Sequence, residues 1–202
     1  MRAAAYAIIL AGCGAPLAKT PKDLPERAPP ASDAEVHVLD ERTLTVEAEV
    51  KALTTHTLHF KRTRGRLAYS PSNPTASSVE VEVDAESATA TIGGVAEVAK
   101  YDFLDASVHK HAGFVSRVLR REGDAFVLIG VLSIRGKARP VELPLTLVEK
   151  GCDLRFSVEF RVHRQDFGVV AQDAKLDGVV SDDLTVRAEG HVLRKKTGCP
   201  DP

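Results

Sequence analysis

Two consecutive segments, residues 141–148 and 154–162, alternate strictly between apolar and polar side chains. Successive side chains of a β-strand point to opposite faces, so each segment has one apolar face and one face suited to water. A pair of such strands encloses its apolar faces by pairing antiparallel within a curved sheet. The alternation therefore predicts a barrel with an apolar interior, which either fills itself with side chains or holds an apolar ligand.

The same pattern recurs along most of the chain. We expect strands at residues 36–39, 44–50, 58–69, 79–83, 113–121, 125–134, 141–148, 154–162 and 184–193. The pattern is interrupted at residues 95–104, where a short helix is expected, and at residues 163–183, a loop long enough to cover a barrel mouth. The predicted fold class is all-β, an antiparallel up-and-down barrel of about eight strands with a short helical excursion, because closure removes exposed strand edges.

Glycine and proline predict where two of these strands bend or end. Gly65 lies within the segment 58–69, where it should produce a bend or a bulge. Residues 133–140 contain Gly136 and Pro140 and should form the turn between two strands.

Charge and motif content exclude several classes of function. The 202 residues carry 27 basic and 28 acidic side chains, a formal net charge of −1, with no long run of like charge. A nucleic-acid partner is therefore not expected. The chain has no G-x-S-x-G, P-loop or G-x-G-x-x-G motif, so we expect no enzyme activity. His56/His59 and His109/His111 are the only close histidine pairs, too few for a zinc site, and neither a metal nor a cofactor is expected.

The N-terminus has the pattern of an export signal. One cation, Arg2, precedes an apolar stretch that ends in Leu10-Ala11-Gly12-Cys13, which resembles a bacterial lipoprotein box. Residues 1–12 are then a signal peptide, and Cys13 is the lipidated first residue of the mature chain. Gly14 after the cysteine favours the outer membrane, by analogy with Gram-negative lipoproteins. The alternative is an ordinary secretory signal that is cut at a small-residue site.

The stretch that follows is rich in proline. Residues 13–34 include five prolines among small and charged residues, a composition that opposes both helix and sheet. We expect an extended tether here, then a barrel domain over residues 35–195 and a C-terminal tail over residues 196–202.

Three motifs resemble those of the YceI-like family. Residues 130–141, Gly-Val-Leu-Ser-Ile-Arg-Gly-Lys-Ala-Arg-Pro-Val, are similar to its G-x-L-T-I-x-G-x-T-x-P-V signature. Phe103-Leu104-Asp105 with Phe114-Val115-Ser116 resembles its F-F-D … F-x-S block, and Arg164 to Gly168 resembles its x-R-x-D-F-G block. The resemblance covers roughly residues 35–195. It implies an exported lipocalin-like barrel that binds a polyisoprenoid or a related lipid.

The implied ligand would lie in the barrel interior. The candidates to line the cavity are Phe60, Phe114, Phe126, Leu132, Val141, Leu143, Phe156, Phe160 and Phe167. A polar head group would contact residues near the loops, for which the candidates are His109, His111, Arg164 and Asp166. The alternative is that the apolar residues only fill the core, and that Asp166, Phe167 and Gly168 only shape a turn. Where the family often has Tyr-Pro, this chain has His109-Lys110, which leaves the rim geometry open.

The two remaining cysteines, Cys152 and Cys199, would be exported to an oxidising compartment. If residues 154–162 and 184–193 form a hairpin, Cys152 lies opposite roughly residue 194, and the tail can fold back to bring Cys199 to it. We predict a Cys152–Cys199 disulfide; the alternative is two unpaired cysteines.

The leading hypothesis is therefore a periplasm-facing, lipid-anchored barrel that binds an isoprenoid, quinone or fatty-acyl lipid. The alternative is an envelope lipoprotein with a solid barrel that serves a structural or interaction role. The oligomeric state is left open, with a homodimer as one option.

Overall fold

The structure, a computed structural model, describes residues 14–27, 29, 31–195 and 199. The predicted signal peptide, residues 1–12, and the predicted lipidation site, Cys13, lie outside the described residues, as does most of the predicted tail. The strands are β1 (Glu35–Asp40), β2 (Leu44–Lys51), β3 (Thr55–Phe60), β4 (Thr63–Tyr69), β5 (Ser78–Asp84), β6 (Ala88–Ala90), β7 (His111–Glu122), β8 (Ala125–Ile134), β9 (Lys137–Lys150), β10 (Asp153–His163) and β11 (Asp183–Leu193). The helices are α1 (Val95–Val98), which continues as a π-helical turn over Ala99–Phe103, and α2 (Ala174–Gly178).

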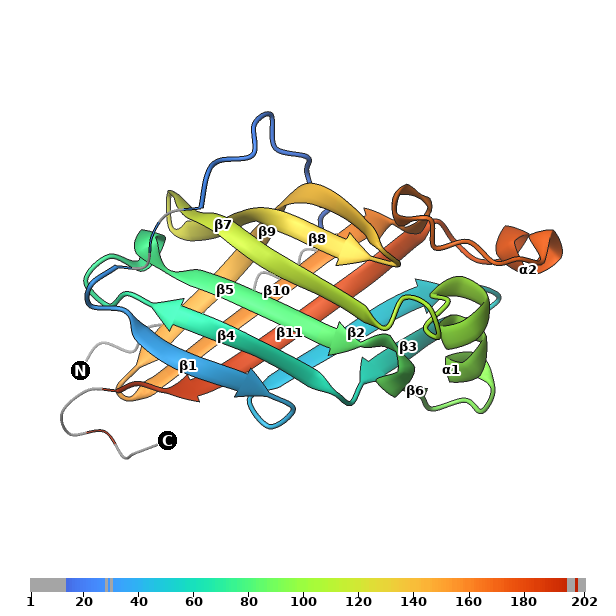
Figure 1. The fold of residues 1–202 in the computed structure, drawn as a ribbon, viewed down its shortest axis with the longest axis horizontal. Helices are drawn as coiled ribbons and strands as arrows, with labels where there is room; N and C mark the ends of the chain where they lie inside the picture. The colour runs from blue at the N-terminus through green and yellow to red at the C-terminus, as the bar shows by residue number, and fades with distance from the viewer. Residues whose placement is uncertain (1–13, 28, 30, 196–198, 200–202) are drawn as a thin grey trace, which may run out of the picture.

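All eleven strands form one antiparallel sheet in the order β1-β4-β5-β7-β8-β9-β10-β11-β2-β3-β6. The sheet curls into a half-barrel whose two layers face each other across the core, with α1 and α2 at one end (Figure 1). The all-β antiparallel class is confirmed, and the helical excursion lies where we expected it. The expected count of about eight strands is wrong, because the sheet has eleven. The expected closure is also wrong, because β1 and β6 remain as sheet edges.

One of the two additional strands arises from a sharp corner at Lys61 and Arg62, and the other is the short strand β6. One continuous strand was expected over residues 58–69, but the corner sends β3 to pair with β2 and β6, and β4 to pair with β1 and β5. Ser87 holds this corner, because its carbonyl accepts from the Lys61 N–H at 3.3 Å and its hydroxyl from the Arg62 N–H at 3.0 Å. The chain thus passes from one layer to the other at this point.

The expected bend at Gly65 is wrong. Gly65 lies in a regular part of β4, where a Cβ would clash with the carbonyl oxygen of Glu80 on β5. The sheet irregularity is instead in β7, between Ser116 and Val118. Here the fully buried Ser116 hydroxyl accepts the N–H of Val79 at 2.8 Å, which satisfies a donor close to the end of the β5–β7 ladder.

The turn between β8 and β9 is much shorter than the residues 133–140 that we expected. It consists of Arg135 and Gly136, with φ angles of 48° and 69°, and the backbone twist of such a left-handed pair matches that of a hairpin. Pro140 therefore lies inside β9, opposite Val131 on β8. The predicted long loop after β10 also contains structure, namely α2 and a short 3-10 turn over Arg164–Phe167.

Part of the predicted tether belongs to the barrel wall. The ladder between β9 and β10 ends at Leu145 and Val158, and beyond this point the two strands diverge. Residues 16–19 fill the space: the Arg161 N–H donates to Pro16 and the Ala18 N–H donates to Arg161, both at 2.7 Å, while the Glu142 N–H donates to Lys19 at 2.8 Å. The expectation of an unpaired tether is wrong for these residues. Pro16 takes part only as an acceptor, through its carbonyl, and the next three residues are not prolines and so keep their N–H donors.

Candidate ligand-binding cavity

An apolar cavity of about 140 Å³ lies between the two layers of the sheet. Its walls are the inward rows of β2, β4, β5, β7, β8, β9, β10 and β11 together with Phe60 of β3, and the polar side chains among the described lining residues are those of Tyr69, Ser77 and Ser78. Most of the cavity residues predicted from the sequence line it: Phe60, Phe114, Leu132, Leu143, Phe156 and Phe160. The alternation of β9 and β10 thus identified the correct face, because their outward residues are charged or polar.

Phe126, Val141 and Phe167 pack elsewhere. Phe126 is only partly buried, and the Arg121 guanidinium lies 5.9 Å from its ring. Val141 is buried opposite Gly130, and Phe167 is buried in the turn after β10. None of the three is among the described residues that line this cavity or the one next to it.

A second apolar cavity, of about 380 Å³, lies at the α1–α2 end of the barrel. Ala48, Phe60 and Leu184 line both cavities, so the two adjoin along the barrel axis. Val179, which follows α2 and is half exposed, also lines the second cavity, which therefore reaches the surface. The sequence did not predict this space, because it depends on how α1 and the loop 163–183 lie over the strand ends.

Arg164 is the only Lys, Arg, Asp or Glu among the described residues that line the two cavities. An arginine has five N–H donors, and Arg164 uses them on Asp177 Oδ1 at 2.7 Å and on the carbonyls of Val169, Asp177, Val180 and Ser181 at 2.7–3.1 Å. The side chain is 3% exposed. It has no donor left for a lipid head group, so it does not fit the role that we predicted for it.

Asp177 is the counter-ion that makes this burial possible. Its carboxylate accepts from Arg164 and from the Ala171 N–H, and these hydrogen bonds lower the pKa of Asp177 below its usual value. Arg164 therefore organises the loop 163–183 around itself.

The other three head-group candidates line neither cavity. Asp166 is exposed, and its backbone carbonyl accepts from Arg139 at 3.2 Å. His111 is half exposed on the outer surface, 3.3 Å from Glu82. His109 lies against Gly136, where a Cβ would come within 2.9 Å of its Nδ1. Besides Arg164, the other basic side chain among the described lining residues is that of His56 in the outer cavity, whose Nε2 lies 3.0 Å from the Thr54 hydroxyl oxygen.

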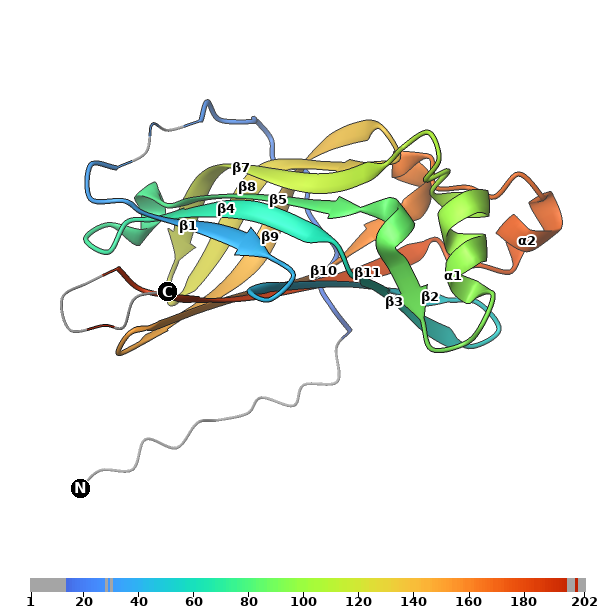
Figure 2. The same cartoon turned by 60° about the horizontal axis from the view of Figure 1, so that its bottom comes forward.

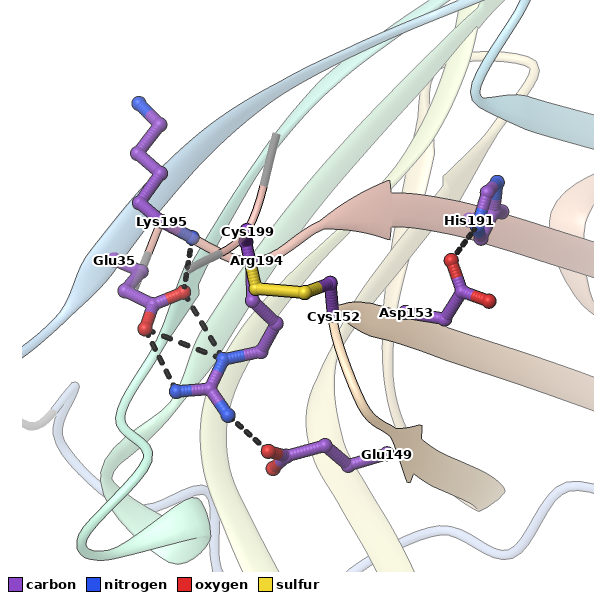
Figure 3. Close-up of a disulfide and its surroundings, with 8 residues drawn as sticks. All are labelled: Glu35, Glu149, Cys152, Asp153, His191, Arg194, Lys195 and Cys199. Carbon is purple, nitrogen blue, oxygen red and sulfur yellow. Dashed lines mark hydrogen bonds and ion pairs between the residues drawn. A yellow bond between two sulfur atoms is a disulfide. The ribbon is translucent and has the colours of Figure 1, made fainter. Parts of the chain in front are cut away.

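A partly buried polar cluster lies near the end of β11, at the end of the barrel away from α1 and α2 (Figure 1), and Figure 3 shows most of it in close-up. The 6%-exposed Arg194 side chain donates to Glu35 at 2.7 Å and to Glu149, and its backbone N–H donates to Cys152 at 2.8 Å. Tyr69, which also lines the inner cavity, donates its hydroxyl to Glu149 at 3.0 Å. Burial and this contact raise the pKa of Tyr69 to about 12. We call Glu35, Tyr69, Glu149 and Arg194 the polar cluster.

The predicted disulfide is present beside this cluster. Cys152 and Cys199 are bonded, with their Cα atoms 5.5 Å apart, and the bond ties the C-terminal tail to the start of β10 (Figure 3). His37 lies nearby and is 4% exposed, with its Nε2 3.6 Å from Glu35. Burial lowers the pKa of His37, mainly because it disfavours the charged imidazolium.

Within the described part of the chain, no set of three metal-binding side chains comes together, and no helix has the length and hydropathy needed to span a bilayer.

Comparison with known proteins identifies the family. The model of the YceI-like domain matches residues 37–192, which is most of the chain. The chain belongs to the YceI-like family. A protein of Pectobacterium atrosepticum named UPF0312 protein ECA1782 is 29% identical over 128 residues, and the alignment covers 55% of this chain and 65% of that relative. The chain thus spans slightly less than two thirds of that protein.

Solved structures show the same fold. BcnA of Burkholderia cenocepacia superposes with a TM-score of 0.68 at 24% identity, covering 74% of this chain and 96% of BcnA. A domain of Saccharophagus degradans described as polyisoprenoid-binding superposes with a TM-score of 0.60 at 12% identity, covering 80% of this chain and 99% of that domain. At this identity both comparisons concern the fold.

Proposed function

We propose that this protein is an exported, lipid-anchored barrel that binds an uncharged apolar lipid, such as a polyisoprenoid or a quinone, in its interior. The observation that carries the proposal is the pair of adjoining apolar cavities, beside which Arg164 has no free donor. The polyisoprenoid-binding description of the S. degradans domain, which has the same fold, supports the ligand class.

The energetics favour a neutral ligand. Each CH₂ group removed from water contributes about 0.8 kcal/mol, so a prenyl chain needs no polar contact along its length. A buried carboxylate or phosphate, by contrast, needs a cation or several N–H donors to offset its desolvation. Since Arg164 cannot supply them, the fatty-acyl ligands that remain candidates are neutral ones, such as esters.

The small volume of the inner cavity supports a second candidate function, that of an interaction module without a lipid ligand. A dry apolar cavity of about 150 Å³ accommodates a benzene-sized molecule, and the inner cavity has about 140 Å³. A longer ligand must also occupy the outer cavity. If it does not, the barrel acts as an interaction module of the envelope without a lipid ligand.

Extraction separates the two functions. The full chain, produced in a bacterial envelope, is extracted with organic solvent and analysed by mass spectrometry. We expect a neutral prenyl or quinone lipid in near-stoichiometric amount. A barrel that is recovered empty and takes up no prenyl alcohol in vitro supports the interaction module instead.

A matched pair of ligands tests the charge argument. Geranylgeraniol and geranylgeranyl phosphate differ only in the head group, and we expect the alcohol to bind at least tenfold more tightly. Equal affinity would show that the phosphate remains in water at the mouth.

The anchor belongs to the same proposal. Lipidation of Cys13 would place the protein on the periplasmic side of the envelope, on the outer membrane. Mass spectrometry of the membrane-bound protein should find acyl groups on Cys13, and the Cys13→Ser variant should be recovered in the soluble fraction.

A further inference from the structure

The segment that follows Cys13 is held by the barrel within a few residues. We call residues 15–19 the N-terminal strap. Leu17 bridges β10 in parallel and Lys19 bridges β9 antiparallel. The Arg161 side chain also holds the strap: its Nε donates to the Ala15 carbonyl at 2.6 Å, and its guanidinium forms an ion pair with Asp183 at 2.7 Å. The strap is therefore bound by both backbone and side-chain contacts.

The strap lies beside the ligand-binding interior. Glu142, which it contacts on β9, precedes the cavity-lining Leu143, and Arg161 on β10 follows the cavity-lining Phe160. Ala18 packs against the core. Without the strap, the N–H groups of Glu142 and Arg161 would lose these partners where β9 and β10 diverge. We call this opening, which the strap fills, the β9–β10 slot.

Chain length then limits how far the barrel can be from an anchor at Cys13. Only Gly14 and Ala15 separate Cys13 from Pro16, the first described residue that is hydrogen-bonded to the backbone of a barrel strand. Three residues extend at most about 11 Å, whereas a free tether over residues 14–34 would extend to about 75 Å. The polar layer of each leaflet is about 6 Å thick, so an 11 Å connection allows little separation between barrel and lipid.

From this we infer that the anchored protein lies with the outer side of β10, next to the β9–β10 slot, against the lipid head groups. The partner of this face is the bilayer surface in which Cys13 is inserted, and the inference rests on the lipid anchor proposed above. In Figure 2 the described N-terminal residues pass beside β10 and end on the outer side of the β10–β11 layer. The long segment between the strap and β1 does not act as a spacer, because it lies after the point where the chain is held.

Tryptophan quenching tests this orientation in the full-length, lipidated chain. The natural sequence has no tryptophan, so one introduced residue is the sole reporter. Leu17→Trp and His163→Trp place it on the strap and at the end of β10, at side chains that are 42% and 45% exposed, respectively. Val38→Trp, at a position that is 78% exposed on the edge strand β1, is the control. The vesicles are phosphatidylcholine with brominated acyl chains.

We expect quenching at positions 17 and 163 to be at least twice that at position 38. Inserting twenty Gly/Ser residues between Gly14 and Ala15 should remove this difference while the protein stays on the membrane. Equal quenching at all three positions in a protein shown to be acylated at Cys13 would overturn the orientation alone. A protein without acyl groups on Cys13 would overturn both the anchor and the orientation. Unchanged melting temperatures of the variants verify that the fold is retained.

Discussion

The two ends of the barrel each bury an arginine, but they use it in opposite ways. At the α1–α2 end, Arg164 takes its partners from the single loop 163–183 and leaves an apolar cavity of about 380 Å³ beside it. At the other end, Arg194 joins carboxylates from β1 and β9, far apart in the sequence, and fills the space between them. One arginine thus holds a single loop beside a cavity, whereas the other links two strands of the sheet.

The largest effect should come from the disulfide beside Arg194. Replacing both Cys152 and Cys199 with Ser removes a cross-link between two residues that lie 47 positions apart in the sequence. Loop-closure entropy predicts a loss of up to about 4 kcal/mol in unfolding free energy, to be measured by urea denaturation. Peptide mapping of the unreduced protein should recover Cys152 linked to Cys199. If both cysteines are recovered as free thiols, the disulfide does not form and cannot stabilise this end of the barrel.

The second effect should come from Arg194→Ala. This change leaves Glu35 and Glu149 without their shared cation, and breaking a buried pair costs about 3 kcal/mol. Arg187→Ala is the matched control: Arg187 also contacts two carboxylates, Glu49 and Glu159, but is 39% exposed, and an exposed pair contributes less than about 1 kcal/mol. If both variants lose the same unfolding free energy in urea denaturation, the polar cluster contributes no more to stability than the exposed ion pairs of Arg187.

The third prediction concerns the cavities. Ala48 lies where they adjoin, so Ala48→Phe should obstruct the interior and reduce geranylgeraniol binding at least tenfold, at an overpacking cost of about 1–3 kcal/mol. Fluorescent displacement measures the binding. Val38→Phe, on the exposed face of β1, is the control and should leave affinity unchanged. Retained binding in Ala48→Phe would place the ligand elsewhere.

The smallest effect should be a pH dependence of the unfolding free energy, caused by His37 beside the polar cluster. Burial lowers the pKa of His37 below its usual 6.5, so between these two values the unfolded chain binds more protons than the folded one. Stability should therefore fall as the pH falls below 6.5. Urea midpoints at pH 7.5 and 5.5 measure this, and His37→Leu should flatten the slope. An unchanged slope would assign the effect to other groups.

Local patterns predicted the strands well where one face is polar. β10 was expected at residues 154–162 and is observed at Asp153–His163. The corner at Lys61 and Arg62 was not predicted, because it depends on Ser87 from a distant part of the sequence. The head-group role of Arg164 was inferred from its place beside a loop, and it fails because the loop itself uses every donor. Charge at a barrel mouth does not by itself predict a free binding group.

The order of residues predicted the all-β class, the apolar interior and the family, because alternation and motif spacing are local properties. The Cys152–Cys199 bond was predicted from an expected hairpin between distant strands, and the structure contains it. Tertiary structure decided what lies between the layers, since cavity volume depends on how side chains from nine strands meet. It also decided that residues 16–19 belong to the wall. Proline content argued for a tether, but the divergence of β9 from β10 offers backbone partners that only the folded sheet creates.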